Sequence, residues 1–151
     1  MYKRILVPID GSETAARGLR EAIAIAGATQ ATLVLLNVAR EASIAMDGMS
    51  MAYYNDLLEL LVKAGKDMVA KASQEAAAAG VACETVVVEA RTSAAWEAII
   101  EQVAQSRCDL VVMGTHGRRG LKRLTLGSDA ELVVRHAPVP VLLVNANAPS
   151  A

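Results

Sequence analysis

The sequence predicts one α/β domain built on a parallel sheet of five strands, with helices on both faces. Apolar runs typical of strands alternate with segments whose apolar residues recur at helical spacing. Two of the runs, 33–36 and 110–113, are continuously apolar, as expected for parallel strands covered on both faces. Because a helical crossover returns each strand in the same direction, the alternation indicates a parallel sheet.

The same patterns locate each element. We expect strands at residues 2–9, 31–38, 81–89, 109–113 and 139–145, and helices at 12–28, 53–79, from Thr92 or Ser93 to Ser106, and 129–136. Ser12 is the expected N-cap of the first helix, Gly27 lies where that helix should stop, and Gly80 should end the second. Glu84 and Thr85 make the third strand more polar than the others, which is typical of a sheet edge.

Composition narrows the class of protein. The 151 residues suit one domain, predicted at 1–146, with 147–151 as a frayed tail. Hydrophobic residues make up 54% of the chain and Phe is absent, so Val, Leu, Ile, Ala and Met must form the core. A net charge of −1 argues against a general nucleic-acid binder, and charged residues interrupt every long apolar stretch, which argues against a membrane span.

The two cysteines and the N-terminal residues bear on the cellular compartment in which the protein is expected. Cys83 and Cys108 each lie beside a strand-like run, where we expect reduced, buried thiols. The first residues enter a strand-like run and lack the length of a secretion signal. We therefore expect a cytoplasmic protein.

A glycine-rich, basic loop at 114–128 is the most informative segment. It joins the strand at 109–113 to the helix at 129–136. Glycines let the backbone approach a phosphate closely, and a helix N-terminus adds partial positive charge. The loop 10–12 after the first strand is also polar, and the two loops would face one crevice if their strands are neighbours. The sequence therefore predicts nucleotide binding at this edge of the sheet.

The glycines do not follow the common nucleotide motifs. Neither G-x-x-x-x-G-K-[ST] nor G-x-G-x-x-G occurs. The pattern is instead G-x2-G-x9-G-S, formed by Gly114, Gly117, Gly127 and Ser128. Together with the opening ILVPIDGS at 5–12, the run DLVVMGTHG at 109–117 and the close HAPVPV at 136–141, this pattern resembles the universal stress protein family over essentially the whole chain.

The resemblance implies a Rossmann-like sheet of strand order 3-2-1-4-5 and membership of the family's ATP-binding branch. By motif position, Pro8, Asp10 and Val38 would flank the adenosine, Gly114, His116 and Gly117 would line the ribose and phosphates, and Gly127 and Ser128 would meet the distal phosphates. Met113, Arg118 and Asp129 complete the expected nucleotide-binding set. Mg²⁺ would be held mainly by the phosphates, so no residue is assigned as a metal ligand or as catalytic.

Several of these residues also have a purely structural interpretation. Gly114 and Gly117 could serve only a sharp turn, and Asp10 could be only a turn former. Ser128 with Glu131 fits a capping box, which could coexist with phosphate binding. The basic run Arg118, Arg119, Lys122 and Arg123 is either a solvated loop or a screen for triphosphate charge.

Other positions depart from the family pattern or stand apart from it. Many members carry an apolar residue where this chain has Asp129, whose charge would weaken nucleotide binding or be tolerated if it points away or meets the metal. The stretch from Arg91 to Ser93 replaces the expected turn before the third helix. Trp96 is expected in the core, and His136 at a helix end as a favourable dipole partner.

Three classes of function are compatible with these sequence features. The preferred one is an ATP-binding sensor or regulatory module for stress response with at most slow hydrolysis, because no catalytic constellation is recognisable. The second is a nucleotide-dependent transferase. The third is an interaction protein with a vestigial site, whose unknown partner would bind the methionine-containing segment 43–54 or the last strand.

The last strand also predicts a homodimer. The segment 139–144, from Val139 to Val144, would lie at the sheet edge in the family's order, and an uncovered apolar edge invites pairing with another copy. The resemblance implies the same two-fold contact. Pro140 removes one ladder donor, so the pairing would run through the other residues.

Overall fold

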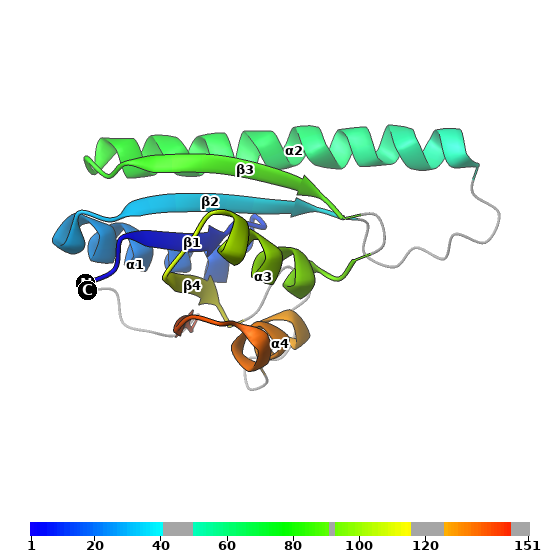
Figure 1. The fold of residues 1–151 in the computed structure, drawn as a ribbon. Helices are drawn as coiled ribbons and strands as arrows, with labels where there is room; N and C mark the ends of the chain where they lie inside the picture. Colours follow the sequence, from blue (N-terminus) through cyan, green and yellow to red (C-terminus); the bar gives the residue numbers. More distant parts are fainter. Residues whose placement is uncertain (41–49, 91–92, 116–125, 146–151) are drawn as a thin grey trace.

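A computed structural model describes residues 1–40, 50–90, 93–115 and 126–145, which form one parallel sheet of strand order β3-β2-β1-β4-β5 (Figure 1). The strands are β1 (Arg4–Pro8), β2 (Thr32–Ala39), β3 (Cys83–Glu89), β4 (Leu110–Gly114) and β5 (Val141–Val144). The helices are α1 (Glu13–Thr29), α2 (Met51–Ala78), α3 (Ala95–Gln105) and α4 (Ser128–His136). The predicted alternation and strand order are confirmed, and the polar strand β3 does lie at an edge.

Two apolar layers sandwich the sheet, because successive side chains of a strand point to opposite faces. Ile5 and Val7 of β1 pack with residues of α1 and α2, among them Leu19 and Val69. Leu6 packs on the other face with residues of α3 and α4, which include Ile99, Val103 and Val133. Helices therefore cover both faces, as the sequence predicts.

The end of α1 differs from the prediction. Ser12 caps its start, accepting a hydrogen bond of 3.1 Å from the Ala15 amide, as expected. Gly27, however, does not stop the helix, which continues to Thr29 and ends at Gln30 in the left-handed conformation with φ +56°. The Gln30 and Ala31 amides both bond to the Ala26 carbonyl, so local backbone bonding ends the helix two residues later.

Of two further predicted helix boundaries, the end of α2 is confirmed and the start of α3 is not. Gly80, with φ +74°, follows α2 as predicted. At α3 the N-cap is Ala94, so the expected cap at Ser93 is wrong, and the alternative, Thr92, lies outside the described residues. The Glu97 carboxylate accepts a hydrogen bond of 2.9 Å from the Ala94 amide. The side chain of the third helical residue thus satisfies this terminus from inside the helix.

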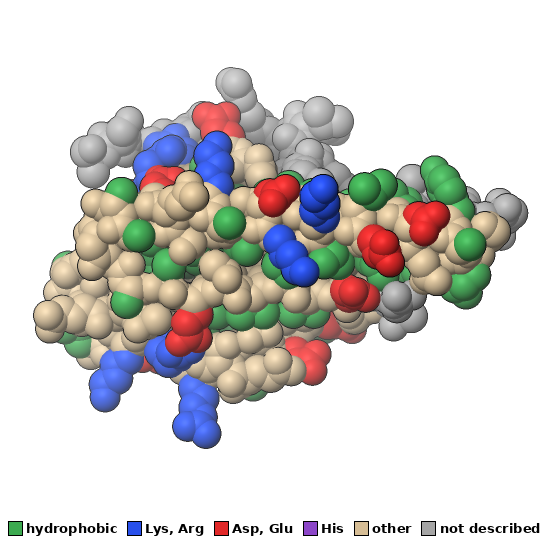
Figure 2. All heavy atoms as spheres, turned by 90° about the horizontal axis from the view of Figure 1, so that it is seen from above, with side chains coloured by type: hydrophobic (Ala, Val, Ile, Leu, Met, Phe, Trp, Pro, Cys, Tyr) green, Lys and Arg blue, Asp and Glu red, His purple; other side chains and the backbone are tan. Residues whose placement is uncertain are grey.

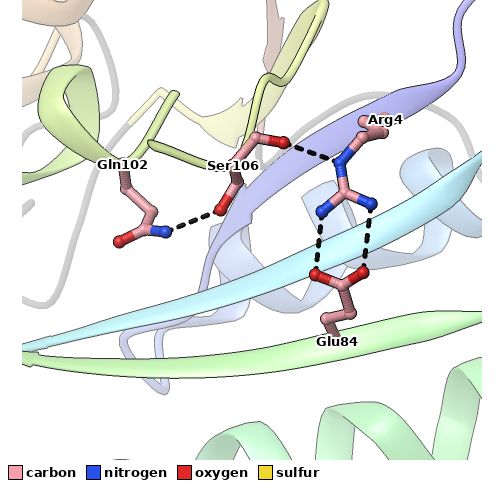
Figure 3. A network of polar contacts seen from close by, with 4 residues as sticks. All are labelled: Arg4, Glu84, Gln102 and Ser106. Carbon is pink, nitrogen blue, oxygen red and sulfur yellow. Dashed lines mark hydrogen bonds and ion pairs between the residues drawn. The ribbon is translucent and has the colours of Figure 1, made fainter. Parts of the chain in front are cut away.

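A polar network ties the amino ends of the strands together (Figure 3). The Asp109 carboxylate accepts hydrogen bonds from the Lys3 and Arg4 amides at 2.8 and 3.0 Å. The Arg4 guanidinium donates to the Ser106 carbonyl at 2.6 Å and to both carboxylate oxygens of Glu84, at 3.0 and 2.8 Å. Arg4 thereby reaches across β2 from β1 to β3, and a planar guanidinium suits such a two-bond contact.

The two cysteines differ in exposure. Cys108 is buried, and burial raises the pKa of its thiol to about 11 because the thiolate would lose its hydration. Cys83 is only half-buried, so the expectation that both thiols are buried is correct for Cys108 alone. The Cys108 thiol, whose pKa is raised, is a poor nucleophile at neutral pH.

Acidic and basic side chains are interspersed on the face of the molecule that α2 forms (Figure 2). Apolar side chains are also exposed on this helix, at Met51, Tyr53 and Leu60. In the part of the chain that the structure describes, no helix has the length and apolar character needed to cross a membrane.

We predict that the Glu84→Gln substitution costs under about 1 kcal/mol of stability at neutral pH, because Glu84 is half-exposed and solvent screens its ion pair. The hydrogen bond from Arg4 lowers the pKa of Glu84, so its stabilising contribution is present above the unfolded-state pKa and is lost as pH falls through the folded-state pKa. Urea unfolding of both proteins from neutral pH down to about pH 3 tests this. A stability difference that does not shrink at acidic pH would contradict the prediction.

Candidate functional site

The candidate site lies where the strand order reverses, at the carboxyl ends of β1 and β4. These strands are direct neighbours, with Ile5 opposite Leu110 and Leu6 opposite Val111. The chain leaves β1 for β2 on one side of this point, whereas β4 leads to β5 on the other. In such sheets the crevice outside the reversal point is the usual ligand site. The adjacency that the sequence left open is therefore confirmed.

The loop after β1 is a tight turn that starts α1. Gly11 has φ +80°, a conformation that favours glycine, and the Asp10 carboxylate accepts a hydrogen bond of 2.9 Å from the Ser12 amide. Asp10 thus does form the turn, through a side-chain bond to the nearby backbone. Ser12 then caps α1, so the helix begins at the same edge of the sheet as the carboxyl end of β1.

Gly114 is explained by packing of α1 against the end of β4. A Cβ atom at Gly114 would lie 2.7 Å from the Thr14 Cβ and 2.8 Å from the Thr14 carbonyl carbon. Gly18, one turn further along α1, lies against the same strand, since its Cβ would be 3.5 Å from the Gly114 amide nitrogen. Thr14 and Gly18 are not among the residues predicted from the sequence. The available signal was a glycine inside a helix, which usually has a packing reason.

The N-terminus of α4 lies directly beside the end of β4. The Gly127 amide donates to the Thr115 carbonyl at 2.9 Å, and the Thr115 amide donates to the Val144 carbonyl at 3.0 Å. Gly127 is the N-cap of α4 and supplies no side-chain acceptor, so the first amides of the helix have no cap from that residue. Gly127 therefore lies next to Thr115, and α4 begins beside the carboxyl end of β4.

The capping-box interpretation of Ser128 is wrong. Ser128 is the first helical residue, because the extended backbone of Gly127 already occupies the N-cap position. Glu131 does not reach back to the N-terminus as a capping box requires. It pairs with Arg135 one turn later, at 2.9 Å. The exposed side chain of Ser128 is thus not used as the helix cap.

Two of the predicted adenosine contacts, Pro8 and Val38, share one face of the sheet with Met113 of the wider nucleotide-binding set. Pro8 lies opposite Leu36 on β2, and Val38 follows Leu36 by two residues, so Pro8 and Val38 point to the same side. Val38 and Met113 both belong to the apolar layer that α3 and α4 cover. Pro8 and Val38 are half-buried, whereas Met113 is 7% exposed. Pro8, Val38 and Met113, on the neighbouring strands β1, β2 and β4, are called the apolar ledge below.

Comparison with known proteins identifies the family. A profile of the Universal stress protein family matches residues 1–145. This chain belongs to the universal stress protein family. It is 32% identical to Universal stress protein MJ0531 of Methanocaldococcus jannaschii over 147 residues, covering 95% of this chain and 82% of that protein.

Further universal stress proteins are similar over almost their whole length. YxiE of Bacillus subtilis is 30% identical over 150 residues, covering 95% of this chain and 99% of that protein. The solved structure of MJ0577, also from Methanocaldococcus jannaschii, is 29% identical, has a TM-score of 0.84 and covers 99% of each chain. The fold described above is thus the fold of this family.

Several residues expected at the nucleotide site of this universal stress protein lie outside the described residues. They are His116, Gly117 and Arg118, together with the rest of the basic run at Arg119, Lys122 and Arg123. Met46 and Met49 of the methionine-containing segment, Arg91 before the third helix and the tail 147–151 also lie outside them. The described part of the site consists of Pro8, Asp10, Val38, Met113, Gly114, Gly127, Ser128 and Asp129.

Asp129 and His136 lie at opposite ends of α4. Asp129 occupies the first turn, where a carboxylate is favourable to the helix dipole. The His136 Nδ1 lies 2.9 Å from the Leu132 carbonyl oxygen, and its ring centroid is 4.7 Å from that of Trp96 on α3. Trp96 is partly buried against the apolar layer of α3 and α4, which locates it at the margin of the expected core. The ring contact of His136 with Trp96 therefore joins α4 to α3.

Within the described ranges, no group of three His, Cys, Asp or Glu side chains is arranged to hold a metal ion.

We predict that Gly114→Ala destabilises the protein by about 1–3 kcal/mol, because the added methyl group meets both the side chain and the backbone carbonyl carbon of Thr14, and the backbone cannot rotate away. Urea unfolding measures the change. Gly27→Ala is the matched control, since a Cβ there has nothing within 4 Å, and it should stabilise α1 by about 1 kcal/mol. Equal stability of Gly114→Ala and the wild type would show that α1 can move away from β4 without cost.

Proposed function

We propose that this universal stress protein is an adenine-nucleotide-binding regulatory module whose ligand is ATP, with Mg²⁺ held mainly by the phosphates. The observation that carries the proposal is the α4 N-terminus, which the bond between Gly127 and Thr115 holds at the strand reversal point. Its first amides have no acceptor from the N-cap side chain and point outward from a helix of nine residues. Such a terminus binds anions through its amides and its dipole.

The phosphates would then lie at the loop 114–128. Gly127 and Ser128 would approach the distal phosphates, and Gly114, His116, Gly117 and Arg118 would line the ribose and the phosphates. Asp129 lies in the same first turn of α4, where its negative charge opposes that of the phosphates unless the metal ion lies between them. This arrangement requires no protein cage for Mg²⁺, because that ion commonly binds through phosphates and water.

The adenosine would pack on the apolar ledge formed by Pro8, Val38 and Met113, with Asp10 at its margin. Ligand sites of this kind combine an apolar floor with a few placed polar groups. Other members of the fold support the ligand class. One solved universal stress protein structure is a complex with cAMP and another, from Arabidopsis thaliana, has AMP bound, although at 24% and 20% identity they share only the fold with this chain.

The proposed module regulates rather than catalyses, with hydrolysis slow at most. The Asp10 carboxylate already accepts the Ser12 amide, which makes it a turn former more than a base for water. We place the module, one domain at 1–146, in the cytoplasm, where the bound nucleotide would control contact with a stress-response partner.

An interaction protein is the second candidate. The first turns of α2 expose Met51 and Tyr53, at 66% and 59%, and Leu60 further along is 63% exposed. Exposed methionine and tyrosine side chains are typical of partner surfaces. In this alternative the nucleotide site is vestigial, and partner binding does not depend on it.

We predict that Mg-ATP binds the nucleotide-stripped protein with a dissociation constant of about micromolar order and that Gly117→Val abolishes the binding. The valine side chain would occupy the space that a phosphate needs close to the backbone. Isothermal titration calorimetry measures both, with AMP and cAMP as competitors and Gly27→Ala as a control that should bind like the wild type. A wild-type protein that binds none of the three nucleotides would favour the interaction-protein candidate.

We also propose a homodimer through the edge strand β5, in the segment 139–144. Leu142 is 39% exposed on this strand, which pairs with β4 along one side. An uncovered edge presents backbone donors and acceptors to a second copy. Light scattering should give the mass of a dimer for the wild type, and Leu142→Lys should shift it toward a monomer because a buried lysine charge opposes pairing. Leu60→Lys, on the distant α2, is the control, and a monomeric wild type would contradict the proposal.

A further inference from the structure

Asn37 is a buried polar residue that the nucleotide motif does not include. It lies in β2 between Leu36 and Val38 and is only 7% exposed. A carboxamide buried without partners costs about 1–3 kcal/mol, so its contacts identify its role. The Asn37 Nδ2 donates to the Ile9 carbonyl at 2.7 Å and lies 3.9 Å from the Met68 sulfur. Its strongest partner is thus the residue immediately before Asp10.

Contacts with β2 and α2 hold the loop after β1 at two residues, Ile9 and Gly11. The Ile9 amide donates to the Leu36 carbonyl at 2.7 Å, which extends the bonding between β1 and β2 by one residue. Asn37 then binds the carbonyl of the same residue. Beyond it, Gly11 lies against Met68, whose sulfur is 3.4 Å from the position of a Cβ at Gly11. The loop is therefore bonded to β2 at Ile9 and packed under α2 at Gly11.

Gly65 on α2 provides the space that Asn37 needs. A Cβ at Gly65 would lie 2.9 Å from the Asn37 Cγ and 3.3 Å from a methyl group of Val87. A glycine inside the 28-residue α2 costs about 1 kcal/mol relative to alanine, which a close neighbour can offset. α2 lies along β2 and β3 (Figure 1), so an alanine at Gly65 would displace the Asn37 carboxamide or the helix.

We infer that Asn37, seated on Gly65 and flanked by Met68, is a positioning residue for the nucleotide loop. It fixes the Ile9 carbonyl and thereby the turn in which Asp10 accepts the Ser12 amide, which sets both the Asp10 carboxylate and the start of α1. Asn37 acts from the side of the sheet that α1 and α2 cover, opposite to the apolar ledge. Nucleotide affinity therefore depends on a side chain that does not touch the ligand. This inference rests on the proposed nucleotide binding.

The first test compares Mg-ATP affinity in Asn37→Asp, Asn37→Leu and the wild type by calorimetry. Aspartate keeps the shape but presents only acceptors when ionised, and leucine removes all polar atoms. Both variants should bind about tenfold more weakly, the equivalent of one lost hydrogen bond. Gly65→Ala keeps the asparagine at position 37 but takes up the space of its carboxamide, so this variant should also bind Mg-ATP more weakly. Wild-type affinity in both folded Asn37 variants would overturn the inference.

The matched control is Gln102→Leu. Gln102 is also 7% exposed, and its Nε2 donates to the Ser106 hydroxyl at 2.6 Å at the amino edge of the sheet. Losing this buried amide should reduce stability and leave the affinity unchanged. A fall in affinity equal to that of Asn37→Leu would show that the effect is general destabilisation, and would overturn the positioning role.

A second measurement separates this inference from the proposed function. Amide hydrogen exchange of the ligand-free protein reports the turn directly, because the Ser12 amide is protected by Asp10. Asn37→Leu should raise exchange at Ser12 about tenfold more than Gln102→Leu does. If the wild type binds no nucleotide, the proposed function fails, and this exchange result alone decides the positioning role. Unchanged exchange at Ser12 would overturn it.

Discussion

The close contact between α1 and the end of β4 is the constraint on which the site depends. Gly114 leaves no room for a side chain, so the first turn of α1 lies directly against the strand. The turn of Asp10 and the bond that joins Thr115 to Gly127 follow the carboxyl ends of the neighbouring strands β1 and β4. A methyl group at Gly114 would separate the two loops by moving α1. The geometry of the candidate site thus depends on a helix–strand contact beneath it.

The two ends of the sheet use polar side chains differently. At the amino edge, Arg4 and Asp109 connect β1 with β3 and with the turn before β4, and no part of this network faces the candidate site. At the carboxyl edge, Asn37 binds the Ile9 carbonyl and supports the loop that carries Asp10. Charged groups thus stabilise one end at the surface, whereas a neutral amide positions the other end from the interior. A neutral amide suits the buried position because an unpaired charge there would cost far more.

The glycines also divide by cause. Gly65 and Gly114 are required by neighbours from other elements, Asn37 and Thr14. Gly11 and Gly80 are required by their own backbone conformation, with φ +80° and +74°. Gly27 has neither reason, because a Cβ there would have nothing within 4 Å. The prediction that Gly27 stops the helix is wrong, since α1 continues to Thr29. A glycine in a sequence indicates a special position, but the cause comes from the partner it faces.

The sequence by itself determined the fold class, the order of strands and helices, the edge position of β3, the family and the loop at which we propose a phosphate site. These follow from the periodicity of apolar residues and from short motifs spread along the chain, at 5–12, 109–128 and 136–141. The tertiary structure alone decided that Gly114 packs on Thr14, that Gly127 rather than Ser128 caps α4, that Glu131 pairs with Arg135, and that Asn37 supports the loop after β1. For Gly114 and Asn37 the partners come from distant parts of the chain, and at α4 the bond from Gly127 to Thr115 sets where the helix begins. Local sequence patterns carry no information on such distances, so only the packed structure could reveal them.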